Sequence, residues 1–163
     1  MKLRKANLSD AKNIKELYSY YILNTNASWQ REERPVKYYE DMLKEHVGMY
    51  PLFIAEEDGK FVGLGSLSAF RSVCAYDRIC ENSIYLKKEC KGKGYGTIIM
   101  QKLLDEAKKL GHWTVTAWID SDNKKSIEFH EKFGFYICGE MPNIGNKSET
   151  RRSVTIMQID LGN

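Results

Sequence analysis

A glycine-rich loop that leads directly into an amphipathic helix is the segment of this 163-residue sequence most suited to ligand chemistry. After the loop, apolar side chains recur at helical spacing from Ile98 to Leu110. The first N–H groups of a helix have no intrahelical partners and carry partial positive charge, so small residues around a helix start form an anion site. The loop residues expected to hold a phosphate-bearing ligand are Lys91, Gly92, Lys93, Gly94, Tyr95, Gly96 and Thr97.

The spacing within the loop excludes two familiar nucleotide sites. A nucleotide-triphosphate loop requires Gly-x-x-x-x-Gly-Lys followed by Ser or Thr, whereas this loop passes from Gly96 through Thr97 into the helix. The dinucleotide fingerprint requires a third glycine at the position of Thr97 and an acidic residue about 20 positions further on. What remains is the pattern Lys91-x-x-Gly94-x-Gly96. Such a loop can also serve close packing without a ligand, so the sequence on either side of the loop is needed to distinguish a binding site from a packing turn.

Composition and charge indicate a single domain spanning residues 1–163. Hydrophobic residues make up 42% of the chain without a break in composition, which is enough for a proper core. No apolar run approaches the roughly 18 residues that span a membrane, and the polar N-terminus lacks a signal-peptide core. We therefore expect a soluble, cytoplasmic protein with no membrane partner. The net charge of +3 does not demand a nucleic-acid partner, although lysines cluster beside the loop.

The cysteines and histidines do not have the spacing of a metal site. The four cysteines contain no Cys-x-x-Cys pair, and none of the three histidines lies at ligand spacing from them. We expect no metal, and we expect reduced, mostly structural thiols. The cysteines are Cys74, Cys80, Cys90 and Cys138, and the histidines are His46, His112 and His130.

Periodicity and turn residues predict a mixed α/β domain without internal repeats. Ser9 is expected to cap the first helix, and Pro35 suits the first turn of the second. An Asp58-Gly59 turn joins two strands as a hairpin, and Gly111 follows the lysine-rich end of the helix after the loop. The expected strands are 3–6, 52–56, 61–67, 83–86, 113–119 and 154–161, and the last expected helix is 123–132.

The loop and its flanking segments resemble a known enzyme family. The pattern Lys91-x-x-Gly94-x-Gly96 is close to the Gln/Arg-x-x-Gly-x-Gly/Ala signature of the GNAT superfamily of N-acetyltransferases. Over nearly the whole chain, the sequence is similar to the phosphinothricin acetyltransferase family within that superfamily. The segments that carry this resemblance are residues 21–29, YPLFIAE at 50–56, AYD at 75–77, ENSIYL at 81–86, the glycine loop, Asn123 and HEKFGF at 130–135.

The resemblance implies a GNAT fold, in which a central, twisted, mostly antiparallel sheet has a splayed strand pair and helices on both faces. It also implies transfer of acetyl from acetyl-CoA to the amine of a small amino-acid-like compound of the phosphinothricin, methionine sulfoximine or methionine sulfone type. No metal takes part, and members often form homodimers. An exposed aromatic side chain such as Trp29 or Trp118 could serve a dimer contact. A non-catalytic module that binds or senses coenzyme A is the alternative interpretation.

Glu81 and His130 are the catalytic residues that the resemblance implies. Glu81 is expected just before the strand 83–86, where its carboxylate can take the ammonium proton of the acceptor or can simply be a solvated side chain at a strand end. His130 occupies the position at which many GNAT enzymes carry a tyrosine that protonates the departing coenzyme A thiolate, and the phosphinothricin-like branch often has histidine there. A lone histidine on a helix is more often a packed or hydrogen-bonded structural residue. For both residues the two interpretations stay open.

The implied cofactor-binding set extends beyond the loop on both sides. The backbone of Ile84, Tyr85 and Leu86 is expected to pair with pantetheine as an added strand would, and one N–H can polarise the thioester carbonyl. Asn123 can hydrogen-bond pantetheine or cap its own helix. Ser126 is assigned to the same set.

The acceptor site is where the sequence departs from the family. Arg71, Tyr76 and Trp29 are the expected substrate-binding residues, and an arginine can grip a carboxylate with two hydrogen bonds. Relatives commonly carry a second arginine where this chain has Val73, and a Trp-x-Asp pattern where it has Arg151-Arg152-Ser153. The two adjacent arginines can bind an anionic acceptor or stay solvated. The identity of the acceptor amine is therefore left open.

Overall fold

Seven strands form one sheet in the computed structural model, which describes residues 1–162. Their order across the sheet is β1-β2-β3-β4-β5-β7-β6, and every neighbouring pair is antiparallel except β4 and β5. The strands are β1 (Lys2–Lys5), β2 (Leu52–Glu57), β3 (Lys60–Ala69), β4 (Ile79–Leu86), β5 (Thr114–Asp120), β6 (Tyr136–Lys147) and β7 (Thr150–Asp160). The helices are α1 (Ala11–Asn24), α2 (Val36–Glu45), α3 (Tyr95–Lys109) and α4 (Lys124–Glu131), with 3-10 turns η1 (Leu8–Asp10), η2 (Cys74–Tyr76) and η3 (Lys88–Cys90). The expected mixed α/β fold is confirmed.

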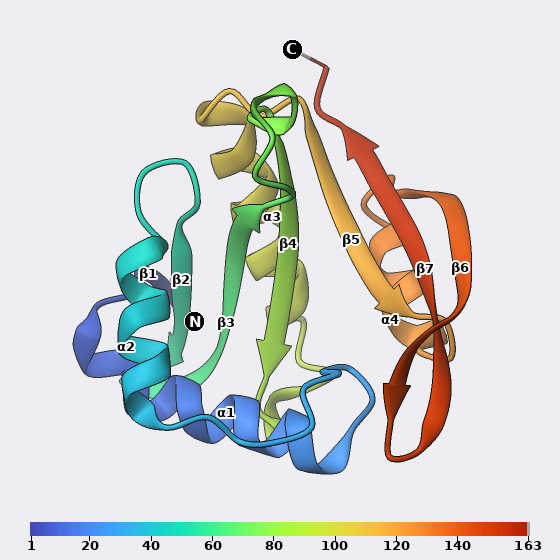
Figure 1. Cartoon of the computed structure of the whole chain (residues 1–163). Helices are drawn as coiled ribbons and strands as arrows, with labels where there is room; N and C mark the ends of the chain where they lie inside the picture. Colours follow the sequence, from blue (N-terminus) through green and yellow to red (C-terminus); the bar gives the residue numbers. More distant parts are fainter. Residues whose placement is uncertain (163) are drawn as a thin grey trace.

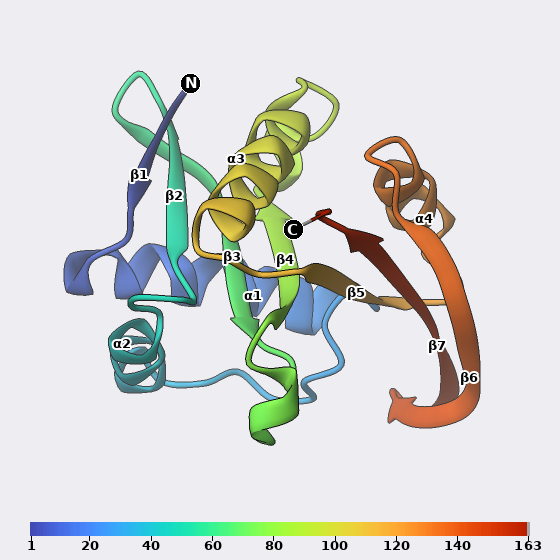
Figure 2. The same cartoon turned by 90° about the horizontal axis from the view of Figure 1, so that it is seen from above.

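Helices cover both faces of the sheet (Figure 1, Figure 2). On one face, α1 and α2 pack over side chains such as Ile54 and Leu64. On the other face, α3 and α4 pack over side chains such as Val115. Because side chains alternate across a strand, β4 contributes to both layers, with Cys80 on the α3 face and Tyr85 on the α1 face. Within residues 1–162, no helix is long and apolar enough to cross a membrane.

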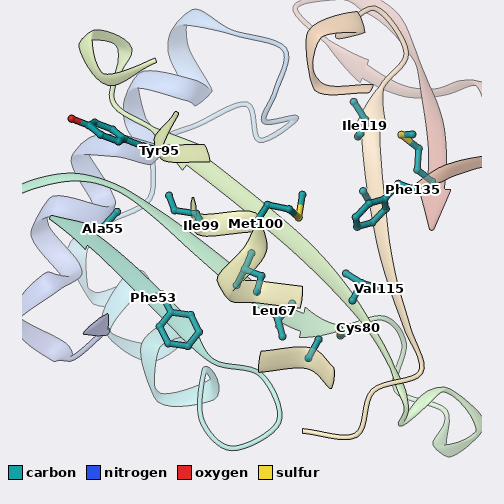
Figure 3. Packing of buried hydrophobic residues seen from close by; sticks show 14 of the residues in the cluster. Phe53, Ala55, Leu67, Cys80, Tyr95, Ile99, Met100, Val115, Ile119 and Phe135 are labelled. Atoms are coloured by element: carbon teal, nitrogen blue, oxygen red, sulfur yellow. The ribbon is translucent and has the colours of Figure 1, made fainter. Parts of the chain in front are cut away.

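Close packing of α3 against the sheet positions the glycine loop. Ile99 and Met100 of this helix are fully buried among the apolar side chains drawn in Figure 3. A Cβ atom on Gly65 of β3 would lie 2.2 Å from Ile99 Cγ2, so only glycine lets the helix approach this closely. In the first turn of α3, a Cβ on Gly96 would lie 3.5 Å from the Phe129 ring of α4. The start of α3 is therefore held next to α4.

The sheet splits between β4 and β5. These two strands are paired over only three residues each, and the last pair is Glu81 and Thr116. Beyond that pair β4 stays with β3 up to Leu86, whereas β5 stays with β7 up to Asp120. Since each strand follows the twist of its own partner, a wedge opens between them, and Figure 1 shows the two strands diverging. The expected splayed strand pair is confirmed.

The C-terminal hairpin differs from the sequence-based expectation. The strand β6 was not predicted, and the last strand begins at Thr150 rather than at Val154. β6 contains Pro142, forms one edge of the sheet and is largely exposed, so it has no hydrophobic alternation to signal it. Its pairing with β7, which includes two register shifts, is what defines it as a strand.

Two local predictions were also wrong. The first helical turn is capped by Asn7 rather than by Ser9, because Asn7 Oδ1 accepts from the Ser9 N–H at 2.9 Å. The Asp10 carboxylate accepts from the Asn7 N–H at 2.8 Å and completes a capping box. Glu81 lies within β4 rather than before it, since pairing with β5 extends this strand back to Ile79.

Candidate active site

The glycine loop has the backbone geometry of an anion site. Gly92 and Gly94 both have a φ of +79°, a left-handed conformation that glycine adopts without strain. Gly94 is the N-cap of α3, and within residues 1–162 no side chain caps this helix start. The Tyr95 hydroxyl donates to the Glu57 carboxylate of β2 and ties the loop to the sheet, at the margin of the apolar cluster (Figure 3). This geometry suits a phosphate group.

A cavity of about 390 Å³ occupies the wedge between β4 and β5. Its walls are residues 82–86 of β4, residues 117–120 of β5 and one side of α4, and its volume suits a small ligand. The expected cofactor-binding residues that line it are Ile84, Tyr85, Leu86, Lys91, Gly96, Asn123 and Ser126. The other expected loop residues do not line it, and they are Gly92, Lys93, Gly94, Tyr95 and Thr97.

One edge of β4 turns its backbone groups toward the wedge. The Lys87 N–H donates to the Val62 carbonyl at 2.9 Å, so the odd-numbered residues of β4 pair with β3 and the even-numbered residues face the wedge. Ile84 and Leu86 are therefore the residues whose N–H and C=O groups point toward the cavity. An extended ligand laid along this edge would continue the sheet as an added strand.

Tyr21 of α1 reaches the same edge. Its hydroxyl donates to the Leu86 carbonyl at 2.8 Å and accepts from the Leu86 N–H at 3.3 Å. The Lys91 ammonium lies 4.8 Å from the centre of the Tyr21 ring. Sequence reasoning missed this residue because Tyr21 fits the apolar face of its helix, and no local pattern indicates a contact with β4.

Glu81 lies at the closed end of the wedge. Its Cα partners are Ser68 of β3 and Thr116 of β5, and it is half-buried. Glu81 and Tyr85 project from the same face of the sheet, because they are an even number of residues apart on one strand. Burial raises the pKa of Glu81. Burial is also the largest cause that raises the pKa of Tyr85 to about 12, and electrostatic repulsion from Tyr21 and from Glu81 adds to it. A carboxylate with a raised pKa is a stronger base than a solvated one.

His130 and Asn123 hold the start of α4 beside the wedge. His130 Nδ1 lies 2.7 Å from the Ser126 carbonyl, and His130 Nε2 lies 3.2 Å from Asn82 Oδ1. Asn82 donates through Nδ2 to the Thr116 carbonyl at 3.0 Å. Asn123 Oδ1 accepts from the Ser126 N–H at 3.3 Å, so Asn123 caps its own helix while it also lines the cavity.

The protonation of His130 is set by opposing effects. Burial lowers the pKa of His130 below its ordinary value, and the hydrogen bond to the Ser126 carbonyl offsets this only in part. Ser126 offers only an acceptor here, and so does the Asn82 side-chain oxygen, so both ring nitrogens are hydrogen-bonded only when the ring carries two protons. His130 is therefore hydrogen-bonded within the protein, as a structural role requires, and it also lines the cavity.

Trp29 and Arg152 converge on Asp120, at the end of β5. Asp120 Oδ2 accepts from Trp29 Nε1 at 3.0 Å and from Arg152 Nε at 2.8 Å. The Trp29 ring packs on Gly145 of β6, where a Cβ atom would lie 2.2 Å from ring atom Cζ3. These contacts fasten the loop after α1 to the β6–β7 hairpin. Arg152 is therefore ion-paired rather than solvated, and Trp29 lies outside the lining of the wedge cavity.

Arg71 and Tyr76 lie beside an aromatic cluster. The guanidinium carbon of Arg71 lies 5.3 Å from the Phe70 ring centre, and the Tyr76 ring meets Phe70 edge-on at 5.4 Å. Phe70 also contacts Trp118, with ring centres 6.2 Å apart. Trp118, considered above for a dimer contact, is only partly exposed and lines the wedge cavity. Arg71 and Val73 are exposed at the rim of this cluster.

The thiols and the acidic side chains form no second reactive centre in the part of the chain that the structure describes. Among residues 1–162, no group of three or more His, Cys, Asp or Glu side chains could hold a metal ion. The four cysteines are free, with Cys80 and Cys90 buried and Cys74 and Cys138 exposed. Burial raises the pKa of Cys80 to about 12, so its thiol stays protonated and unreactive.

Comparison with known sequences identifies the family. Residues 14–135 match the acetyltransferase (GNAT) family. The chain belongs to this family. Its sequence is 30% identical to the L-amino acid N-acyltransferase MnaT of Escherichia coli (strain K12), over 99% of this chain and 94% of that protein. It is 32% identical to the L-methionine sulfoximine/L-methionine sulfone acetyltransferase of Salmonella typhimurium, over 99% of this chain and 95% of that protein.

Solved structures share the fold of this GNAT domain. The structure of yncA from Salmonella typhimurium with its cofactor acetyl-CoA matches with a TM-score of 0.95 and 30% identity, over 100% of this chain and 95% of that one. The GNAT superfamily phosphinothricin acetyltransferase from Sinorhizobium meliloti in complex with AcCoA matches with a TM-score of 0.93 and 30% identity, over 99% and 88%. The resemblance inferred from the loop and its flanks is confirmed.

Proposed function

We propose that this protein transfers an acetyl group from acetyl-CoA to the amine of a small amino-acid-like substrate. The observation that carries the proposal is the β4–β5 wedge, whose cavity reaches the uncapped start of α3 at Gly96 and lies next to the last β4–β5 pair at Glu81. The half-buried Glu81 side chain does not itself line this cavity. Acetyl-CoA supplies a thioester-activated acetyl group. One C–N bond forms, the C–S bond breaks, the ammonium proton of the acceptor passes to a base, and coenzyme A leaves as its thiol.

The residues at the wedge fit coenzyme A. The backbone N–H groups at the start of α3, with Lys91 and Lys93 beside them, suit its phosphates. The backbone of Ile84 suits the amide groups of pantetheine, which would lie along β4 as an added strand. Asn123 uses its side-chain oxygen as a helix cap, and its amide nitrogen can donate to pantetheine. Ser126 lines the same wall of the cavity.

Glu81 is the proposed general base, and His130 is the proposed proton donor to the departing sulfur. An amine attacks a thioester only in its neutral form, so the raised pKa of the Glu81 carboxyl favours proton removal, directly or through water. His130 holds a proton at Nε2 on the wall of the wedge when it hydrogen-bonds Asn82. Because a thiolate is a good leaving group, His130 should contribute less to turnover than Glu81.

The acceptor is proposed to be a small amino acid or a close analogue. The relatives named above are an L-amino acid N-acyltransferase and an L-methionine sulfoximine/L-methionine sulfone acetyltransferase. Arg71 is the exposed cation at the rim of the aromatic cluster and is the proposed partner of the acceptor carboxylate, with Tyr76 beside it. Trp29 contributes by holding the loop after α1 in place. Of the two adjacent arginines, Arg152 is already ion-paired with Asp120. Arg151 has an exposed side chain and is the one that can bind an anionic acceptor.

A homodimer and a cytoplasmic location are part of the same proposal. β6 is one of the two edge strands of the sheet and exposes large apolar side chains along its length, which supports an interface there. These side chains belong to Tyr136, Ile137, Met141 and Ile144. Acetyl-CoA is an intracellular metabolite, which supports the location.

A thiol-release assay tests the proposed function. The protein is incubated with acetyl-CoA and a panel of amines that includes L-methionine sulfone, L-methionine sulfoximine, phosphinothricin and common L-amino acids, and free thiol is followed. We expect release that depends on one class of amine, and a loss of about 100-fold in Glu81→Gln. Glu89→Gln, which removes an exposed carboxylate from η3, is the matched control. Tight acetyl-CoA binding without amine-dependent release would support the non-catalytic module instead.

A further inference from the structure

The hydroxyl of Tyr21 occupies both hydrogen-bonding groups that Leu86 turns toward the wedge. Tyr21 is only 5% exposed, and its ring is held edge-on against Tyr85 and Tyr20, with ring centres 4.8 Å and 5.5 Å away. Tyr21 lines the wedge cavity and also an adjoining cavity of about 240 Å³. The side chain is therefore a built part of the wedge and not a surface residue.

The contact with Leu86 imitates a strand partner. Buried backbone N–H and C=O groups each need a hydrogen-bond partner, and the single phenol hydroxyl serves both groups of Leu86. A ligand that pairs with β4 as an added strand can reach the backbone of Ile84 along the open edge. At Leu86 the same ligand meets the Tyr21 hydroxyl. It can pair with Leu86 only after that hydroxyl has moved away.

Lys91 links this contact to the glycine loop. Its ammonium lies 4.8 Å from the centre of the Tyr21 ring, which is within cation–π range, and Lys91 lines both cavities. A phosphate in the loop would offer the ammonium a charge-assisted hydrogen bond, which is a stronger partner than a ring face. The hold of Lys91 on Tyr21 should therefore weaken when an anion occupies the loop.

We propose that Tyr21 is an internal substitute for the cofactor on β4: it occupies Leu86 in the cofactor-free protein, and acetyl-CoA displaces it. The inference rests on the proposed function and assigns to it a residue outside the glycine loop that sets cofactor affinity. The displacement also reaches the acceptor side of the protein. Tyr21 lies in the last turn of α1, where its carbonyl accepts from the Thr25 N–H at 3.2 Å, and the loop that follows carries Trp29.

Tyr21→Phe tests the proposal, because it keeps the ring and removes the hydroxyl. Without the competing hydrogen bonds, the dissociation constant for acetyl-CoA measured by titration calorimetry should fall by roughly threefold to tenfold. In the cofactor-free protein, hydrogen exchange of the Leu86 amide should become faster. Tyr20→Phe, a change in the neighbouring ring of the same helix, is the matched control and should alter neither quantity.

The possible outcomes separate this inference from the proposed function. A dissociation constant for Tyr21→Phe equal to or above that of the wild type overturns the inference, and so does unchanged exchange at Leu86. Wild-type protein that fails to bind acetyl-CoA overturns the proposed function instead. Inorganic pyrophosphate alone should accelerate Leu86 exchange in the wild type by drawing Lys91 from the ring. Unchanged exchange at Leu86 with pyrophosphate bound overturns the step through Lys91.

Discussion

Replacing Asp120 by asparagine should lower the free energy of unfolding by about 3 kcal/mol. The Asp120 carboxylate is 6% exposed and accepts from Trp29 Nε1 at 3.0 Å, from Arg152 Nε at 2.8 Å and from the Asp122 N–H at 3.0 Å. Asparagine keeps the shape but has one acceptor oxygen and no charge. The side chain of Arg152, which is 10% exposed, then loses its main counter-charge.

The size of the expected loss in unfolding free energy depends on the partners that Arg152 keeps in Asp120→Asn. Removing one partner of a buried ion pair costs about 3–5 kcal/mol when the other charge is left alone. Here the Asp122 carboxylate still lies 3.0 Å from Arg152, and the asparagine oxygen can still accept one hydrogen bond, so the lower end of that range applies. For a chain of 163 residues, about 3 kcal/mol corresponds to a fall in Tm of roughly 6–12 °C.

The effect of Asp120→Asn should depend on pH. Burial acts to raise the pKa of Asp120, but the hydrogen bonds from Arg152 and Trp29 outweigh it and hold the pKa below its ordinary value. A carboxyl group with a depressed pKa in the folded state stabilises the fold above its unfolded pKa and loses that contribution as the pH falls through the folded pKa. The difference between wild type and variant should be complete at pH 7 and shrink below about pH 4.

Urea unfolding at pH 7 measures the effect, with Asp122→Asn as the matched control. Asp122 contacts the same guanidinium, but its side chain is 78% exposed, so its loss should cost about 0.5 kcal/mol or less. If Asp120→Asn destabilises the protein no more than Asp122→Asn does, the buried carboxylate is not what joins the loop after α1 to the C-terminal hairpin, and the reasoning fails.

Three further outcomes are expected. Glu81→Gln should reduce turnover most at mildly acidic pH, where the acceptor is mainly ammonium, and less at alkaline pH, where it is already neutral; a ratio to wild type that is constant with pH would remove its role as base. Gly65→Ala should destabilise the protein by about 1–3 kcal/mol in urea unfolding, because the added Cβ would lie 2.2 Å from Ile99 Cγ2, while Gly139→Ala, with no heavy atom within 4 Å of its Cβ, should be nearly neutral. His130→Gln should cost turnover about tenfold or less, and a loss as large as that of Glu81→Gln would show that thiolate protonation limits the rate.

The features that local residues specify could be predicted from the sequence. The loop needs left-handed backbone at Gly92 and Gly94, and glycine is the residue that adopts it without strain, so the pattern is visible in the sequence. The helix after the loop and the hairpin at Asp58-Gly59 follow from periodicity and turn chemistry in the same way. The position of Glu81 relative to its strand was misjudged because pairing with β5 lengthens β4 at its start.

Partners from distant segments were not predictable. Lys147 is 6% exposed although it is a lysine, and its ammonium donates to the Thr25 carbonyl, 122 residues away in the chain, at 2.5 Å. The residues shortly before it in β6 include Pro142, Asn143, Gly145 and Asn146, which are residue types typical of a surface turn. Nothing in it indicates a buried cation. Burial lowers the pKa of Lys147, and only the tertiary structure shows the carbonyl groups that accept from it.

The sequence by itself determined the family, the glycine loop and the order of most elements, because these depend on backbone preferences and on spacing along a short stretch of chain. The tertiary structure alone decided how the wedge is lined. It brings Tyr21 to Leu86 across 65 residues and Trp29 to Asp120 across 91 residues. These contacts depend on how α1 and the C-terminal hairpin pack against a split sheet. The local sequence around a tyrosine or a tryptophan is the same whether its ring only fills the core or its polar atom also hydrogen-bonds a distant strand.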